Sequence, residues 1–275
     1  NALEHVVYLH SESWTGFLAS GERRPAAAVG NREVANIQYT SGTTGSPKGV
    51  LLTHRNLVNN GWLIGERLRM TAADRLCSPV PMYHCFGCVI ASMMCFLTGT
   101  ALILPAPAFD PLATLQAIHD ERATSLYGVP TMFIAELDNP AFKTFDLTSL
   151  RTGMMAGAPC PVEVMNRCVA DMNLREITIG YGMTETSPVS TQTWIGDPVE
   201  KQTGTVGKAH PHVEIKIVDA DGNVVPRGVA GEFCTRGYSV MLGYWDDEEK
   251  TTQSIDKNGW MHTGDLATMD DDGYC

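Results

Sequence analysis

Positive charge is scarce in this sequence. Its 275 residues include 20 lysines and arginines against 31 aspartates and glutamates, which gives a formal net charge of −11. Proteins that bind nucleic acid carry clustered basic residues on one face, so this class is excluded. A single nucleotide is not excluded, because its phosphates need only a few local donors and one cation. We interpret the acidic runs at 246–249 and 270–272 as solvated surface.

Long apolar runs and paired cysteine motifs are also missing. No stretch reaches the roughly 18 apolar residues of a membrane span, and residues 1–5 lack the basic and apolar regions of a signal peptide. Cys85 and Cys88 form one C-x-x-C, but no second pair follows at zinc-finger spacing. Most of the eight cysteines stand among apolar neighbours. We therefore expect reduced thiols and a reducing compartment, either the cytoplasm or the mitochondrial matrix.

The two ends predict that the chain is part of a longer protein. It begins with Asn1 rather than an initiator methionine, and it stops at Cys275 just after a turn signal. The length between them is enough for one large domain or two modest ones.

Short apolar runs alternate with helix-length amphipathic stretches over residues 1–200. This alternation predicts an α/β fold whose mostly parallel sheets are flanked by helices. From about Gly204 the runs shorten and Asp221-Gly222 marks a hairpin turn, which predicts a β-rich subdomain over residues 201–275. The expected strands are 34–40, 49–53, 76–80, 101–104, 125–127, 151–156, 176–181, 213–218, 231–235 and 266–269. The expected helices are 56–69, 89–97, 111–121, 131–137 and 162–172, the third with Asp110 as its N-cap.

The most informative segment is residues 40–49, TSGTTGSPKG. Glycines let the backbone adopt positive φ and approach a ligand closely, so that successive N–H groups can surround phosphate oxygens. The hydroxyls add donors, and Lys48 adds a compact positive charge. A Walker-type P-loop is excluded, because Pro47 stands where glycine should precede the lysine and Gly49 replaces the magnesium-binding hydroxyl.

Together with Tyr39, this segment is similar, residue for residue, to the Y-T-S-G-T-T-G-x-P-K-G signature of the acyl-adenylate-forming (AMP-binding) superfamily. That group contains acyl-CoA synthetases, peptide-synthetase adenylation domains and firefly-type luciferases. The resemblance spans nearly the whole chain and implies a fragment of the large N-terminal domain, with a small distorted β-barrel as its β-rich part. Four further segments resemble the family's motifs in order: P-x-x-H-x-x-G at 81–87, A-G-A-P at 156–159, Y-G-x-T-E at 181–185 and T-G-D at 263–265.

The resemblance implies a reaction in two halves. A carboxylate attacks the α-phosphorus of MgATP to give acyl-AMP and pyrophosphate, and the thiol of coenzyme A then takes the acyl group. A fatty acid has a pKa near the ~4.3 of Glu, so it is ionised at pH 7 and needs no general base. Positioning and charge neutralisation must accelerate the reaction instead. The resemblance assigns these roles to Lys48, Thr184, Glu185 and His84, with Mg²⁺ held by Glu185.

The same motifs assign the remaining site residues. Tyr181 is expected to stack on adenine, the Thr184 hydroxyl to approach the α-phosphate and Asp265 to accept hydrogen bonds from the ribose. The expected nucleotide-binding set is Thr40, Ser41, Gly42, Thr43, Thr44, Gly45, Gly157, Ala158, Pro159, Tyr181, Gly182, Thr184 and Asp265. The expected acyl pocket is formed by His84, Val129, Met132 and Met183, beside Gly157.

Segments 83–85, 127–133 and 240–245 are similar to the medium-chain fatty-acyl-CoA synthetase branch. Three other functions stay open: a peptide-synthetase adenylation domain, a luciferase, or a non-catalytic nucleotide-binding module. The adenylation domain is disfavoured because segment 127–133 contains no Asp that could bind a substrate amine. The family carries an arginine motif and a C-terminal lid domain with a lysine, and an N-terminal segment that completes the first subdomain. These lie outside the sequence, so we expect the chain alone to be poorly active.

Overall fold

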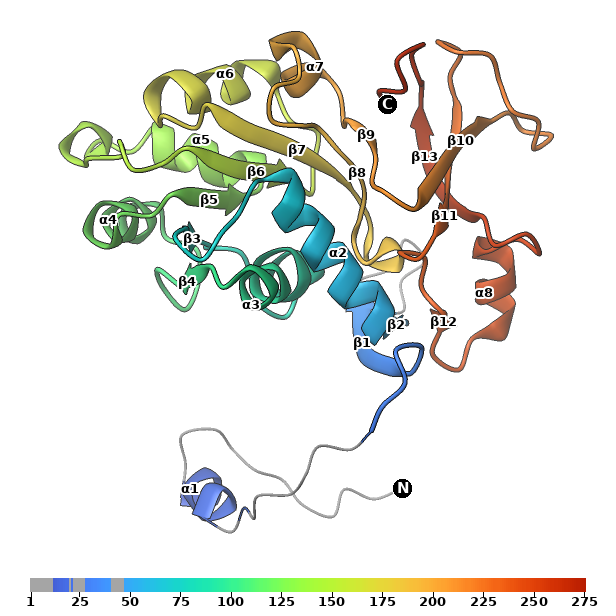
Figure 1. Ribbon diagram of the computed structural model, residues 1–275, viewed down its shortest axis with the longest axis horizontal. Coiled ribbons are helices and arrows are strands. Elements are labelled where there is room, and N and C mark those ends of the chain that lie inside the picture. The colour runs from blue at the N-terminus through green and yellow to red at the C-terminus, as the bar shows by residue number, and fades with distance from the viewer. Residues whose placement is uncertain (1–11, 20, 22–27, 41–46) are drawn as a thin grey trace. The chain divides into compact units, whose positions relative to one another are not determined.

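The computed structural model describes residues 12–19, 21, 28–40 and 47–275, and the chain divides into two compact units, 1–30 and 31–275. The first unit contains one described helix, α1 (Glu12–Ala19). Every other described element belongs to the second unit and is labelled in Figure 1 where there is room. None of the described helices is long and apolar enough to cross a bilayer.

A seven-stranded sheet forms the larger part of the second unit, in the order β4-β3-β5-β6-β7-β8-β9. Its first five strands are parallel, whereas β8 and β9 are antiparallel to their neighbours. This arrangement confirms the predicted α/β class with a mostly parallel sheet. The strands are β3 (Arg75–Cys77), β4 (Ala101–Ile103), β5 (Ser125–Gly128), β6 (Thr152–Ala156), β7 (Glu176–Gly182), β8 (Val189–Gln192) and β9 (Lys208–Ala209).

Helices cover both faces of this sheet. They are α2 (His54–Arg67), the π-helix η1 (Phe86–Met93), α3 (Met94–Thr98), α4 (Pro111–Glu121), α5 (Pro130–Leu137) and α6 (Val162–Asp171). Successive strand residues point to opposite sides, so Leu126 and Met155 pack with α4, α5 and α6 while Tyr127 and Met154 pack with α2, η1 and α3. Figure 1 shows the two helical layers on either side of the strands. The predicted N-cap of α4 is confirmed, since Asp110 accepts from Ala113 N–H at 2.8 Å.

The helix predicted over 89–97 starts earlier and in a wider form. It begins as a π-helix at Phe86 and continues as α3. A Cβ on Gly87 would lie 2.2 Å from the Pro81 carbonyl oxygen, so only glycine permits this close approach. Because π-turns are frequent at functional sites, this turn agrees with the prediction that His84, just before it, belongs to the site.

A three-stranded sheet, β1-β2-β12, holds the two ends of the predicted phosphate loop. It consists of β1 (Val34–Thr40), β2 (Lys48–Thr53) and β12 (Gly243–Tyr244). Thr40 and Lys48 are directly paired, so the loop leaves and re-enters the sheet at one point. Helix α2 follows β2 at once, where Thr53 Oγ1 accepts from Asn56 N–H at 3.2 Å as the N-cap.

The predicted β-rich part contains an antiparallel sheet, β10-β11-β13, whose described strands do not close into the expected barrel. The strands are β10 (Val213–Val218), β11 (Gly231–Gly237) and β13 (Met261–Ala267). Strand β13 starts at Met261, before the start predicted at residue 266. Two steps along β11, from Glu232 to Cys234, correspond to four along β13, from Leu266 to His262. The extra residues form a bulge that includes Gly264 at φ 77° and redirects the neighbouring Asp265.

Four further short elements complete the second unit. The sequence patterns did not predict them, nor β8, β9 and β12. They are η2 (Phe142–Thr144), η3 (Thr184–Thr186), α7 (Val199–Gly204) and α8 (Glu248–Ser254).

Candidate functional site

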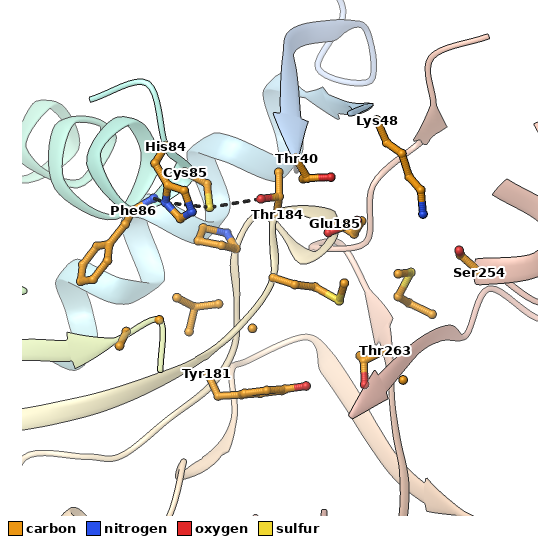
Figure 2. A pocket seen from close by; sticks show the side chains of 18 of the residues that line it. Thr40, Lys48, His84, Cys85, Phe86, Tyr181, Thr184, Glu185, Ser254 and Thr263 are labelled. Atoms are coloured by element: carbon orange, nitrogen blue, oxygen red, sulfur yellow. Dashed lines mark hydrogen bonds between the residues drawn. The ribbon is translucent and has the colours of Figure 1, made fainter. Parts of the chain in front are cut away.

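The carboxyl ends of β6 and β7 open onto a cavity of about 860 Å³, the larger cavity. Ligands of open α/β sheets bind at this end of the strands. The cavity combines residues that are far apart in the sequence. His84, Cys85 and Phe86 face it from one side, and Lys48 and Ser254 face it from the other (Figure 2).

The end of β7 sets the position of Thr184 and Glu185. A Cβ on Gly182 would lie 1.8 Å from the Pro188 carbonyl oxygen, so only glycine allows the chain to double back so closely. The short helix η3 then begins, and Met183 N–H donates to Thr186 Oγ1 at 3.0 Å. This bond fixes the turn and holds Thr184 and Glu185 at the cavity wall.

Glu185 is held from two directions by the segment that contains β12. The Tyr244 hydroxyl donates to Glu185 Oε1 at 2.8 Å, and Met241 N–H donates to the Glu185 carbonyl oxygen at the same distance. Burial, followed by the nearby Glu185 carboxylate, raises the pKa of Tyr244, so the phenol keeps its proton. The Lys48 ammonium lies 5.1 Å from the centre of the Tyr244 ring. Tyr244 therefore contacts both Lys48, the predicted cation, and Glu185, the predicted carboxylate.

His84 and Cys85 form a neutral part of the wall. His84 Nδ1 accepts from Phe86 N–H at 3.1 Å, and burial lowers the pKa of His84, so its ring is uncharged at pH 7. Cys85 Sγ lies 3.5 Å from Thr184 Oγ1, a contact drawn as a dashed line in Figure 2. Burial raises the pKa of Cys85 to about 11, which leaves the thiol protonated and a poor nucleophile.

A smaller cavity of about 650 Å³ adjoins the first, and Gly157 and Tyr181 border both. The Tyr181 hydroxyl donates to Asp265 Oδ2 at 2.6 Å, which links the end of β7 to the bulge of β13. The Tyr181 ring meets the Phe233 ring edge-on, with centroids 4.8 Å apart. Gly157 has φ 85°, a left-handed conformation that permits the tight turn after β6.

Most of the predicted site residues therefore lie together. Those at the larger cavity are Thr40, Lys48, His84, Gly157, Tyr181, Gly182, Met183, Thr184 and Glu185. Ala158, Pro159 and Asp265 line the smaller cavity. Ser41, Gly42, Thr43, Thr44 and Gly45 lie outside the described residues. Val129 and Met132, predicted for the acyl pocket, pack behind its wall against the apolar cluster that contains Phe86 and Ile90.

Sequence reasoning missed several polar residues of the wall, among them Tyr244, Glu232 and His262. Tyr244 lies in segment 240–245, to which the family resemblance assigns no role in the site. Its contact with Glu185 spans 59 positions and depends on the pairing of β12 with β2. Glu232 Oε2 and His262 Nδ1 lie 2.8 Å apart across β11 and β13.

The donor set around Glu185 fits Mg²⁺. This ion prefers oxygen ligands and is usually held by one or two carboxylates together with substrate phosphates and water. Glu185 brings one buried carboxylate to the wall, the Tyr244 hydroxyl fixes its orientation, and the Thr184 hydroxyl is its neighbour. Lys48 adds a cation on the same side, so the arrangement suits a phosphate group with a hard metal ion.

A family model described as AMP-binding enzyme matches residues 3–245. The chain belongs to the AMP-binding enzyme family. It is 53% identical over 243 residues to the putative acyl-CoA synthetase YngI of Bacillus subtilis, a match that covers 88% of this chain and 44% of that protein. It is 48% identical over 243 residues to the mitochondrial medium-chain acyl-CoA ligase ACSF2 of Danio rerio, covering 87% of this chain and 40% of the relative.

Solved structures of AMP-binding enzymes share the fold. The ATP-bound crystal structure of MatB from Rhodopseudomonas palustris matches with a TM-score of 0.85 at 32% identity, over 95% of this chain and 51% of MatB. This likeness agrees with the α/β class predicted from the sequence. The chain spans about half the length of MatB, and less than half of YngI and ACSF2.

Proposed function

We propose that this AMP-binding family member is part of an acid–thiol ligase, which activates a carboxylic acid with MgATP and transfers the acyl group to coenzyme A. The observation that carries the proposal is the larger cavity. Lys48, Thr184 and Glu185 stand on its wall together with the apolar side chains of Phe86 and Ile90. A cation, a hydroxyl and a carboxylate suit phosphate with Mg²⁺, and an apolar wall suits a hydrocarbon chain.

We assign the adenosine to the smaller cavity, between the turn at 157–159 and the bulge of β13. Asp265 supports this assignment, because a carboxylate at a cavity wall can accept hydrogen bonds from ribose hydroxyls. Tyr181 borders both cavities, so a nucleotide lying across it would direct its phosphates toward Lys48 and Thr184. The hydroxyl of Tyr181 already donates to Asp265, which keeps that carboxylate oriented.

The first half-reaction then needs no protein base. An oxygen of the ionised acid forms a bond to the α-phosphorus, the bond to the bridging oxygen breaks, and pyrophosphate leaves with its electron pair. Lys48 and the Thr184 hydroxyl donate to phosphate oxygens, and Glu185 would hold Mg²⁺, whose charge neutralises the phosphates. Removing one such preorganised donor typically costs about 10²–10³ in rate.

We propose a medium-chain fatty acid as the substrate. His84 is neutral and Phe86 and Ile90 are apolar, so this wall favours contact with a hydrocarbon chain over contact with a charged group. Each buried CH₂ contributes about 0.8 kcal/mol, roughly a fourfold gain in affinity. The name of the ACSF2 relative, a medium-chain ligase, supports the same class. The word mitochondrial in the name of that relative also supports a mitochondrial protein, one of the two compartments expected from the reduced thiols.

The proposal is tested by ATP–pyrophosphate exchange on the longest natural form of the protein, with straight-chain acids of graded length. Exchange should require an acid and Mg²⁺, and the apparent affinity should rise about fourfold per CH₂ up to a medium-chain optimum. The chain alone should bind nucleotide but turn over little, since it spans less than half the length of its ligase relatives.

Two other outcomes would replace this proposal. Exchange driven by amino acids would indicate an adenylation domain, although no aspartate is found among the described residues that line the larger cavity. Nucleotide binding without exchange for any acid would indicate a non-catalytic module.

A further inference from the structure

A cluster of three metal-binding residue types lies on the antiparallel sheet, beside the proposed nucleotide site. Glu232 and Cys234 are two residues apart on β11, so their side chains share one face of the sheet. His262 on β13 is the direct cross-strand partner of Cys234. Ligand atoms of all three residues lie within 4.8 Å of one another, and β11 and β13 run side by side in Figure 1.

The distance between Cys234 and His262 in this cluster matches that of a tetrahedral zinc site. Zinc bonds of about 2.3 Å to sulfur and 2.0–2.1 Å to nitrogen imply a sulfur–nitrogen separation of about 3.5 Å. Cys234 Sγ and His262 Nδ1 are 3.5 Å apart. Glu232 Oε2 and His262 Nδ1 are 2.8 Å apart, a hydrogen bond in the metal-free protein. That pair must open by about 0.5 Å when a metal ion replaces the shared hydrogen.

We propose that Glu232, Cys234 and His262 bind a borderline-soft divalent cation of the Zn²⁺ class. A thiolate, an imidazole and a carboxylate select such an ion over Mg²⁺ or Ca²⁺, which take oxygen ligands. This site is therefore distinct from the proposed Mg²⁺ position at Glu185.

The surroundings of the cluster support a metal site with one open position. Gly264 N–H donates to Glu232 Oε1 at 3.1 Å, an outer-shell bond of the kind that orients ligands. Cys234 is fully buried, whereas the side chains of Glu232 and His262 are each 31% exposed and line the larger cavity. Because two of the three residues line the cavity, an ion could reach the cluster from that space, and water there could supply a fourth ligand. Lys216 on β10 is the cross-strand partner of Cys234 on its other side. Its ammonium lies 4.6 Å from the centre of the Trp260 ring.

Cobalt provides the test, because Co²⁺ accepts the same ligands and its bond to a thiolate gives a charge-transfer band in the near ultraviolet. The chain, stripped of metal by a chelator, should bind one equivalent of Co²⁺ with this band, and Zn²⁺ should displace it. Cys234→Ser should abolish the band. His262→Gln, a change at a partly exposed position, should keep the band and weaken Co²⁺ binding by more than about tenfold, since even outer-shell mutations cost 10–100-fold.

The matched control is Cys88→Ser, which removes a partly buried thiol outside the cluster. It should leave both the band and the affinity unchanged. A band that persists in Cys234→Ser, or that disappears in Cys88→Ser, would place the metal at another thiol and overturn the proposal. So would the absence of a band in the folded wild-type chain. If circular dichroism shows that Cys234→Ser does not fold, unchanged affinity in His262→Gln is the result that refutes the site. The readout is metal binding alone, so it is independent of the proposed ligase activity.

Discussion

Replacing Lys48 with methionine would remove the charge that faces the larger cavity and keep most of the side-chain volume. The ammonium of Lys48 lies over the Tyr244 ring at 5.1 Å, and the residue is half-buried at the start of β2. A cation–π contact at such a site contributes about 0.5–1 kcal/mol. A charge-assisted hydrogen bond to a phosphate contributes more, about 1.5–3 kcal/mol. The substitution should therefore affect ATP binding more than folding.

Isothermal titration on the variant checks this difference. Lys48→Met should raise the dissociation constant of MgATP by about 10- to 100-fold, because each 1.4 kcal/mol is a factor of ten. The affinity for adenosine, which lacks phosphates, should change less than about twofold. The melting temperature should fall by only about 1–3 °C, as expected for a loss of 0.5–1 kcal/mol in a chain of this size.

Lys208→Met is the matched control. The Lys208 ammonium lies 4.2 Å from the Tyr274 ring centre, which is a similar contact between two residues that line neither cavity. This variant should show a comparable small change in melting temperature and unchanged MgATP affinity. The reasoning is refuted if Lys48→Met weakens adenosine and MgATP equally, or if the two lysine variants lose MgATP affinity to the same extent.

Three further predictions concern the positioning of the site and the core. Tyr244→Phe removes the hydroxyl that donates to Glu185 at 2.8 Å; denaturant unfolding should show a loss of about 1.5–3 kcal/mol, and an unchanged midpoint would contradict the assigned bond. Gly182→Ala would place a Cβ 1.8 Å from the Pro188 oxygen, so the variant should melt lower and lose nucleotide binding, whereas wild-type behaviour would show that the turn can relax. Burial raises the pKa of Glu136, whose two oxygens have no hydrogen-bond partner among the described residues. The folded protein keeps the Glu136 proton, whereas the unfolded chain releases it above pH ~4.5, so the free energy of unfolding falls as pH rises. Glu136→Gln should therefore raise the melting temperature more at pH 8 than at pH 5. An equal rise at both pH values would contradict the raised pKa of Glu136.

Local patterns predicted much of the fold because the strands and helices of the α/β part have strong local signals. The bounds of β1, α4 and β10 are those expected from the sequence. Buried parallel strands appear as short apolar runs, and Asp110 before Pro111 marks a helix start. The π-helix that begins at Phe86 was missed because hydrophobic periodicity does not distinguish a π-helical turn from an α-helical one.

The site was predictable only where the motifs are contiguous. Residues 181–185 run without interruption from the end of β7 into η3, so their closeness in sequence keeps them close in space. The contact of Tyr244 with Glu185 and the pairing of Cys234 with His262 depend on strand register between distant segments. The predicted strand starts at 266, after Asp265, whereas Asp265 lies inside β13, next to Gly264 in the bulge. The sequence contains no local signal for that register shift.

The central claim is that one continuous site binds a nucleotide and an acyl chain together. It is tested most directly by competition between AMP and a non-hydrolysable octanoyl-adenylate analogue for this chain, measured by titration calorimetry. Since each buried CH₂ contributes about 0.8 kcal/mol, burial of even four such groups predicts that the analogue binds more than about 100-fold tighter than AMP. Equal affinities for the two ligands would contradict the account and leave only a nucleotide-binding module.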